Sequence, residues 1–258
     1  MSIHRFRSRK LHSFEHGFFT RLGGISIGIF EGLNCGTGSK DDHKKVQFNR
    51  NLVAAEMNVK PQELITVHQE HSARAVVVDS PLEVLTRADA IVTNTPNLSI
   101  GVLTADCLPV LFADKKNHVI GVAHAGWKGA LNGILENTVH SMIELGADVK
   151  SIKAVIGPCI SPSIYEVGQD FFDTFTERST SIQNYFSTGV NKKKYFFNLP
   201  KFALDRLYNL EISDAEWIGN CTYQESDKFY SYRRSQHLGE LDYGRQISTI
   251  KIYFLYYL

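Results

Sequence analysis

Short runs rich in β-branched and aromatic residues recur along the whole chain, and several follow one another with no helical segment between them. Such runs, bounded by Gly, Pro, Asn or Asp, are typical of strands. Because strands outnumber helices and do not alternate regularly with them, the order favours an α+β fold, with mixed β-sheets and flanking helices, over a regular βαβ array. The expected strands span residues 14–20, 64–68, 73–79, 90–93, 98–103, 109–113, 119–124, 152–156 and 245–254.

Four segments have helical periodicity instead. The first begins after Asp41 and Asp42, which offer an N-cap, and the second follows the i, i+3, i+4 rule from Leu131 to Ile143 and stops at Gly146. The remaining two expected helices cover residues 168–177 and 201–210.

The composition is that of a globular protein. The 258 residues carry 28 Lys and Arg against 27 Asp and Glu, a formal net charge of +1. A balance this even gives no electrostatic argument for a nucleic-acid or membrane partner. The length suits one domain over residues 1–258, because no repeat, linker or shift in composition divides it.

The ends and the cysteines favour a cytoplasmic protein. The basic N-terminus is not followed by the apolar segment of a signal peptide, and the short aromatic run 250–258 is expected to be a last strand rather than an anchor. The four cysteines are far apart and form no C-x-x-C pair, which favours free thiols over a disulfide framework.

Three residues at the ends of expected strands form an unusual set: His71, Cys107 and His124. Two imidazoles and one thiolate are the ligands of an open zinc site, which keeps a fourth position for water or substrate. The gaps of 36 and 17 residues match no local zinc pattern, so adjacent strands would have to bring the three together. Cys107 and His124 would equally serve a metal-free cysteine hydrolase as nucleophile and base, and the residues alone leave both alternatives open.

Two other metal patterns fail. His68 and Glu70 fit the H-x-E half of a zinc-deaminase signature, but Pro162 stands where the last cysteine of P-C-x-x-C is needed after Pro158 and Cys159. A multicopper oxidase needs many histidines, usually in H-x-H pairs, and the ten histidines here contain no such pair.

Several polar residues are candidates for substrate binding. Arg21 precedes a Gly-Gly turn and could clamp a phosphate or carboxylate, or could be an ordinary surface arginine. Asn49 and Arg50 fall on the apolar side of the first helix, so they form either a structural hydrogen-bond bridge or part of a site. Gly126 lies where a strand enters the second helix, whose free N–H groups could bind an anion. Arg233 is a surface or ion-pair residue or belongs to the site.

Eleven motifs occur in a characteristic order: His16-Gly17, Thr20 to Ser26, Leu33-Asn34, Asn49-Arg50, Gln69-Glu70-His71, Ala105 to Pro109, His124 to Gly129, Ile156 to Ile160, Tyr165-Glu166-Val167, Cys221-Thr222 and Ser231 to Arg234. Together they resemble the YfiH/laccase-domain family over about residues 12–250. These are bacterial zinc-dependent purine nucleoside phosphorylases, formerly called polyphenol oxidase or multicopper oxidase-like proteins.

The resemblance implies an α+β fold like that of the YfiH-like cysteine hydrolases, with His71, Cys107 and His124 as catalytic zinc ligands and Arg21 beside them. It implies phosphorolysis of adenosine, inosine, guanosine and methylthioadenosine to free base and ribose 1-phosphate, with adenosine deaminase activity. Ser72 stands where many members have Gly, which bears on the rim of the site rather than on the ligands.

On this hypothesis, Zn²⁺ and Arg21 orient phosphate, and Asp106 is the nearest titratable group that could donate a proton to the leaving base. The expected partners are small molecules, and the chain is expected to be a monomer or a homodimer. The alternatives are a metal-free cysteine hydrolase, with editing of peptidoglycan precursors as a secondary possibility, and a non-catalytic, zinc-stabilised interaction protein.

Overall fold

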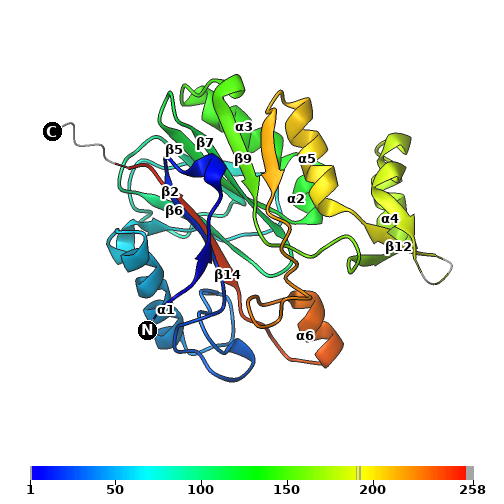
Figure 1. Cartoon of the computed structure of the whole chain (residues 1–258), viewed down its shortest axis with the longest axis horizontal. Helices are drawn as coiled ribbons and strands as arrows, with labels where there is room; N and C mark the ends of the chain where they lie inside the picture. The colour runs from blue at the N-terminus through cyan, green and yellow to red at the C-terminus, as the bar shows by residue number, and fades with distance from the viewer. Residues whose placement is uncertain (1, 190, 192, 254–258) are drawn as a thin grey trace.

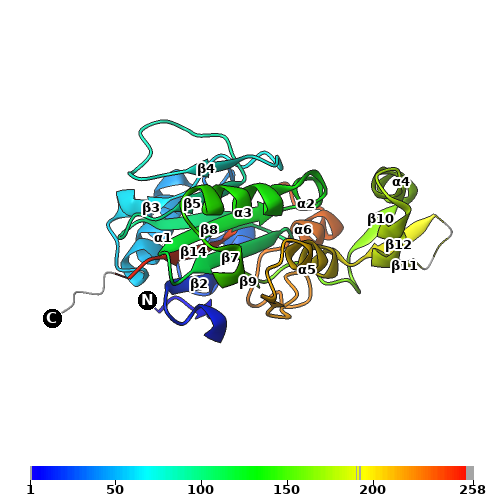
Figure 2. The same ribbon diagram turned by 90° about the horizontal axis from the view of Figure 1, so that it is seen from above.

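Two β-sheets lie face to face in the computed structural model, which describes residues 2–189, 191 and 193–253 (Figures 1 and 2). Both sheets mix parallel and antiparallel strand pairs. The larger sheet has the order β13 (Asp214–Trp217), β9 (Ile152–Ile156), β7 (Leu108–Asp114), β8 (Val119–Ala125), β5 (Ala90–Thr93) and β4 (Ala75–Val77). The smaller has the order β1 (Arg5–Phe6), β2 (Glu15–Phe19), β14 (Gln246–Lys251), β6 (Ser99–Thr104) and β3 (Leu64–Ile65).

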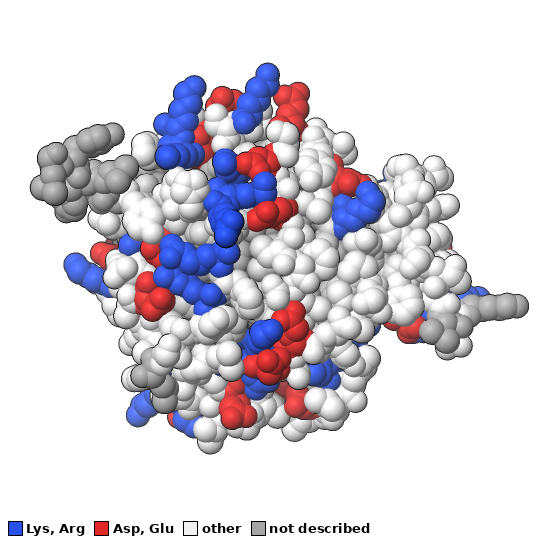
Figure 3. Space-filling view, in the orientation of Figure 1, with Lys and Arg blue, Asp and Glu red and all other residues white. Residues whose placement is uncertain are grey.

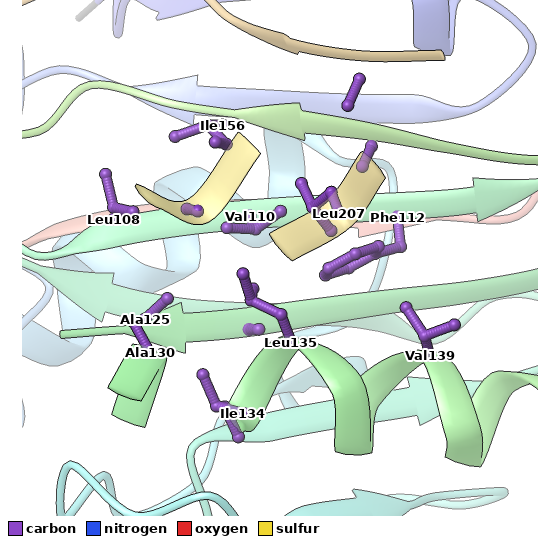
Figure 4. Close-up of a cluster of buried hydrophobic side chains, with 14 of the residues drawn as sticks. Leu108, Val110, Phe112, Ala125, Ala130, Ile134, Leu135, Val139, Ile156 and Leu207 are labelled. Carbon is purple, nitrogen blue, oxygen red and sulfur yellow. The ribbon is translucent and has the colours of Figure 1, made fainter. Parts of the chain in front are cut away.

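The two-residue period of the strands divides the core into layers. On β7, Leu111 and Ala113 join the apolar cluster shared with the smaller sheet, whereas Val110 and Phe112 join the cluster under the helices (Figure 4). Both faces of β7 are therefore buried, and all seven of its residues are inaccessible to solvent.

Helices cover the outer face of each sheet. The larger sheet packs against α3 (Ile134–Glu144) and α5 (Leu199–Asn209). The smaller sheet packs against α1 (His43–Glu56), where Val53 and the C-cap residue Met57 are fully buried beside Phe19. This helix begins at the expected cap, because the side chain of Asp42 accepts a hydrogen bond from Lys44 N.

A small third sheet forms a lobe beside the sandwich, at the right of Figure 2. Its order is β10 (Glu166–Gly168), β12 (Lys194–Phe197) and β11 (Phe186–Thr188), with α4 (Gln169–Thr176) against it. Aromatic rings hold the lobe together: Phe171, Phe175 and Phe197 pack against one another with centroids 4.7 to 5.3 Å apart. Trp127, at the start of α2 (Trp127–Asn132), contacts Phe171 at 4.8 Å and connects this lobe to the sandwich.

The charged groups on the face shown in Figure 3 are of both signs, with Lys and Arg interspersed among Asp and Glu. Asp214, for example, pairs with both Lys10 and Lys153. No helix among the described residues is long and apolar enough to cross a membrane.

The α+β class with mixed sheets is confirmed, and every expected strand overlaps an observed one. All four cysteines are free thiols. The expected helix over 131–146 is instead two helices, because Gly133 adopts a φ of +97° and separates α2 from α3. The last strand ends at Lys251, and residues 254–258 lie outside the described residues. The strands and α-helices that the sequence did not predict are β1, β10, β11, β12, β13 and α6 (Tyr232–Leu238).

Candidate active site

His71, Cys107 and His124 lie together, with their ligand atoms all within 4.8 Å of one another. The register of the larger sheet brings two of them close, because Leu108 of β7 pairs with Ala125 of β8, and each strand carries its ligand next to that pair. His71 enters from the loop between β3 and β4 in the left-handed conformation, with a φ of +59°. Its Nε2 lies 3.8 Å from the sulfur of Cys107. The sheet register thus brings Cys107 and His124 together, whereas His71, expected at a strand end, comes from a loop.

Asp89 organises this cluster from behind. Its fully buried carboxylate accepts a 2.8 Å hydrogen bond from His124 Nδ1, which turns the other ring nitrogen of His124 toward the cluster. The same carboxylate accepts from the backbone N–H groups of Glu70, His71 and Ser72. One side chain therefore orients His124 and fixes the strained loop that carries His71.

Asp89 was not among the site residues expected from the sequence. The signal that could have found it is an acidic residue directly before the continuously buried strand β5, where an unpaired carboxylate would be costly.

Gly126 gives the cluster its room. A Cβ at this position would lie 2.7 Å from His71 Cδ2 and 3.0 Å from Cys107 Sγ. The absent side chain thus allows two of the three ligands to approach the backbone.

The protonation states suit a thiolate. Burial disfavours the Cys107 anion, but the charge and hydrogen bond of His124 lower its pKa to about 6. Burial likewise disfavours the His124 cation, but the charge of Cys107 and the hydrogen bond to Asp89 raise its pKa to about 9. Without a metal, the structure therefore favours a thiolate beside an imidazolium.

The same donors fit a metal ion of the zinc type. Two imidazoles and a thiolate bind zinc in preference to harder cations. Among the residues that the structure describes, no fourth His, Cys, Asp or Glu joins the cluster. A position is thus left for a small ligand, as in catalytic rather than structural sites.

Two cavities share His71, Ala105 and Cys107 in their walls. The first, here called the aromatic cavity, has a volume of about 510 Å³ and is walled by Trp127, Tyr165 and Phe171. The second, here called the Arg245 cavity, has a volume of about 530 Å³ and is walled by Thr66, Thr104, His124, Tyr243 and Arg245. Both volumes lie in the range of about 300–1,000 Å³ that is typical of small-molecule sites.

Asp106 and Arg233 meet in the wall of the aromatic cavity. Asp106 accepts from Thr222 Oγ1 and from Arg233 N, both at 2.6 Å, so it fastens the start of α6 to the strand-end loop. Burial raises its pKa. The guanidinium of Arg233 lies over the ring of Tyr165 at 5.5 Å. The structure therefore brings these two expected residues to the site.

Arg21 lies elsewhere. It lines a separate shallow hollow with the Gly-Gly turn and is in the wall of neither cavity described above. Its guanidinium donates to the carbonyls of Glu31 and Ser226 and stacks on Tyr230 at 4.7 Å. The expected position beside the metal ligands finds no support in this geometry, because the arginine is engaged in holding loops together.

Asn49 and Arg50 have separate roles. Asn49 is a structural bridge: its Oδ1 accepts from Ile25 N, and its Nδ2 donates to Ser26 Oγ and to the Gly32 and Asn34 carbonyls. Arg50 donates to Thr66 Oγ1 at 3.0 Å, and Thr66 is part of the wall of the Arg245 cavity. Of the two alternatives for this pair, Asn49 is thus the structural bridge, and Arg50 is next to a residue of a cavity wall.

Known proteins are similar to this one over most of the chain. The family model described as multi-copper polyphenol oxidoreductase laccase matches residues 15–253. The purine nucleoside phosphorylase of Haemophilus influenzae is 35% identical over 234 residues, which are 90% of this chain and 93% of that relative. Purine nucleoside phosphorylase YfiH of Escherichia coli is 32% identical over 222 residues, 86% of this chain and 89% of that one.

Two solved structures share the architecture. The YfiH protein of Bacillus licheniformis has a TM-score of 0.87 at 29% identity, with 95% of this chain and 94% of that chain covered. A Neisseria meningitidis protein has a TM-score of 0.84 at 33% identity, with coverages of 93% and 94%.

Proposed function

The chain belongs to the multi-copper polyphenol oxidoreductase laccase family, and from that premise we propose that it is a zinc-dependent purine nucleoside phosphorylase. The relatives that carry the name purine nucleoside phosphorylase support the reaction. The substrates proposed are adenosine, inosine, guanosine and methylthioadenosine, with adenosine deamination as a second activity.

The observation that carries this proposal is the three-ligand cluster at the junction of two cavities. A copper oxidase needs several copper ions and many histidines, whereas the cluster found among the described residues holds two histidines and one cysteine. When bound there by His71, Cys107 and His124, Zn²⁺ would supply Lewis acidity that stabilises negative charge on an oxygen.

The chain's own groups divide the remaining work. The rings of Trp127, Tyr165 and Phe171 offer flat apolar surfaces on which a purine can stack. In phosphorolysis, an oxygen of phosphate forms a bond to C1′ of the ribose while the bond from C1′ to the purine nitrogen breaks. The bonding electrons leave with the purine, which then needs a proton. Asp106 lines the same cavity, and burial raises the pKa of its carboxyl, so it is the group proposed to supply one.

A metal-free cysteine hydrolase is the second candidate. The observation that favours it is the lowered pKa of Cys107 beside the raised pKa of His124, which is typical of an activated cysteine nucleophile. Because a zinc ligand also has to be a thiolate, this observation is compatible with both candidates.

The deciding experiment measures free base released from a panel of purine nucleosides, with and without inorganic phosphate, alongside the zinc content of the same preparation. The proposal expects about one zinc per chain and base release that requires phosphate. Deamination of adenosine consumes water and is expected without phosphate. Activity that persists in zinc-free protein would instead support the cysteine hydrolase.

A further inference from the structure

The Arg245 cavity differs in charge from its neighbour. The described residues in its wall include Arg245 but no Asp or Glu, whereas the wall of the aromatic cavity includes Asp106 and Glu166. Arg245 is three-quarters or more buried, stacks on Tyr243 at 4.3 Å, and has its nearest carboxylate, Asp242, at 3.6 Å outside the wall. Apart from the Cys107–His124 pair, the cavity wall therefore presents the Arg245 cation with no carboxylate beside it in the wall.

A hydroxyl in the same wall has no partner. Thr104, at the end of β6, is 2% exposed, and its Oγ1 makes no hydrogen bond within the described residues. A buried hydroxyl without a partner is destabilising by about 1–3 kcal/mol. The presence of this hydroxyl in a cavity wall is explained if a ligand accepts a hydrogen bond from it.

A second cation stands behind this wall. The buried guanidinium of Arg50 donates to Thr66 Oγ1, while its Nη1 has no hydrogen-bond partner among the described residues. Within the described residues, Arg50 forms no ion pair. The titratable group that acts on it is Cys35, and burial raises the pKa of this thiol to about 12, so the thiol is neutral. Because Thr66 accepts from Arg50, its own O–H remains available to the cavity. A buried cation without a counter-charge is costly, and an anion nearby would offset that cost.

We propose that the Arg245 cavity is the phosphate subsite, with Arg245, Thr104 and Thr66 as its donors and Arg50 as the charge behind it. The aromatic cavity is then left for the nucleoside, and the two reactants meet at the wall that both cavities share, beside His71 and Cys107. This assignment rests on the proposed function, because it gives the second substrate of phosphorolysis a place. It also gives the phosphate role expected of Arg21 to other residues.

Phosphate fits these donors better than a nucleoside does. A phosphate dianion accepts several hydrogen bonds at once and gains from a guanidinium and hydroxyl groups in a partly buried site. The flat rings that a purine needs line the other cavity instead. Phosphate bound here would lie beside His71, Cys107 and His124, which are in the same wall.

The test uses the zinc-loaded full chain, with Thr104→Val and Arg245→Gln as variants. Valine has the shape of threonine and removes a buried hydroxyl that has no partner, so the Thr104→Val protein is expected to fold normally. Each variant is expected to raise the KM for phosphate by roughly 10-fold or more and to leave the KM for inosine within about twofold. The exposed Arg178→Gln serves as the charge-matched control.

A direct binding measurement separates the subsite from the reaction. Inorganic phosphate alone is titrated into the wild-type protein, the two variants and the control, and Tm and calorimetric heat are recorded. We expect a phosphate-dependent rise in Tm for the wild-type and control proteins, and its loss in both variants.

Each outcome decides. If inosine's KM rises instead of phosphate's, or if both variants keep the phosphate-dependent rise in Tm, the assignment is wrong. It is equally wrong if Arg21→Ala alone abolishes phosphate binding. If the wild-type protein binds phosphate but cleaves no nucleoside, and both variants lose that binding, the proposed function fails while the phosphate subsite stands.

Discussion

Cys107 supplies the thiolate of the proposed metal-ligand cluster, in which the other two members, His71 and His124, are imidazoles. We predict that Cys107→Ser loses most of the bound zinc, because a serine hydroxyl is a harder donor and ionises far less readily than a thiol whose pKa is about 6. Elemental analysis of the protein purified from zinc-replete medium measures the loss. A Cys107→Ser protein that keeps a full complement of zinc would show that the cluster is not the metal site.

Cys159 provides the matched control for that measurement. It is fully buried in the core cluster under the helices and lies outside the metal-ligand cluster. Cys159→Ala is expected to keep its zinc and to lose about 1 kcal/mol of unfolding free energy. Equal loss of zinc from both variants would mean that the ligands are assigned wrongly.

The carboxylate of Asp89 contributes stability that depends on pH. Burial opposes its ionisation, but hydrogen bonds from His124 and Ser72 outweigh burial and lower its pKa from 3.8 to about 2. A carboxylate with a lowered folded-state pKa stabilises the protein above the unfolded-state pKa, and this contribution is lost as the pH falls through the folded-state value. In the metal-free protein it amounts to roughly 2 kcal/mol near neutral pH.

Urea unfolding between pH 6 and pH 2, an interval that includes both pKa values of 3.8 and about 2, measures that contribution. The wild-type protein should lose more unfolding free energy over this range than Asp89→Asn does. The substitution should also weaken zinc binding by about 10- to 100-fold, because it disturbs the partner that orients His124. Parallel pH profiles for the two proteins would contradict the role given to this carboxylate.

How far the sequence predicts single residues depends on whether the role follows from residue type or from neighbours. The grouping of His71, Cys107 and His124 could be predicted because few side chains bind zinc and because strands or their ends were expected near all three. The role of Asp89 was missed, because an acid before a buried strand shows only that it needs a partner, and its partner His124 is identified by the fold. Arg21 was expected at the site but lies outside both cavities. The fold, rather than the residue type, decides this, because its partners Glu31 and Ser226 come from other parts of the chain.

At the scale of elements, the long apolar strands were predicted well because burial on both faces leaves a strong signal, as in β7. The three strands of the small sheet were missed because each is only three or four residues long and alternation cannot be recognised over so few positions. The division of the second helix was missed because a glycine inside an apolar periodic pattern can be tolerated within a helix.

That division yields a prediction for Gly133. Its φ of +97° is costly for any residue with a Cβ, although a Cβ there would meet only Glu136 Oε2 at 3.6 Å, an ordinary contact. We expect Gly133→Ala to lower the unfolding free energy by about 1–2 kcal/mol through backbone strain alone. Urea denaturation measures it against Gly38→Ala, where the glycine has no positive φ and open space around it. Equal stabilities for the two variants would show that one continuous helix can form across residue 133.

For the molecule as a whole, the question is what the metal contributes to the fold. Three buried apolar clusters, one between the sheets and one beneath each helical layer, lie within the described residues. A chain of this length buries roughly 75% of its unfolded surface on folding, so its core needs no metal to be stable. This separates a catalytic zinc site from the structural site of a zinc-stabilised interaction protein, whose fold depends on the ion.

Removal of the metal should therefore leave the protein folded. After dialysis against a chelator, we expect unchanged far-ultraviolet circular dichroism and a single cooperative thermal transition. Free zinc at about 100 times its Kd stabilises the folded state by about 2.7 kcal/mol, so its removal should lower Tm by roughly 5–10 °C. Activity should disappear and return with added zinc. Because the ligands sit on a loop and two strand ends held by Asp89 and the sheet register, they remain close to one another without the ion. Loss of secondary structure at 25 °C on chelation would contradict this and would support the zinc-stabilised interaction protein instead.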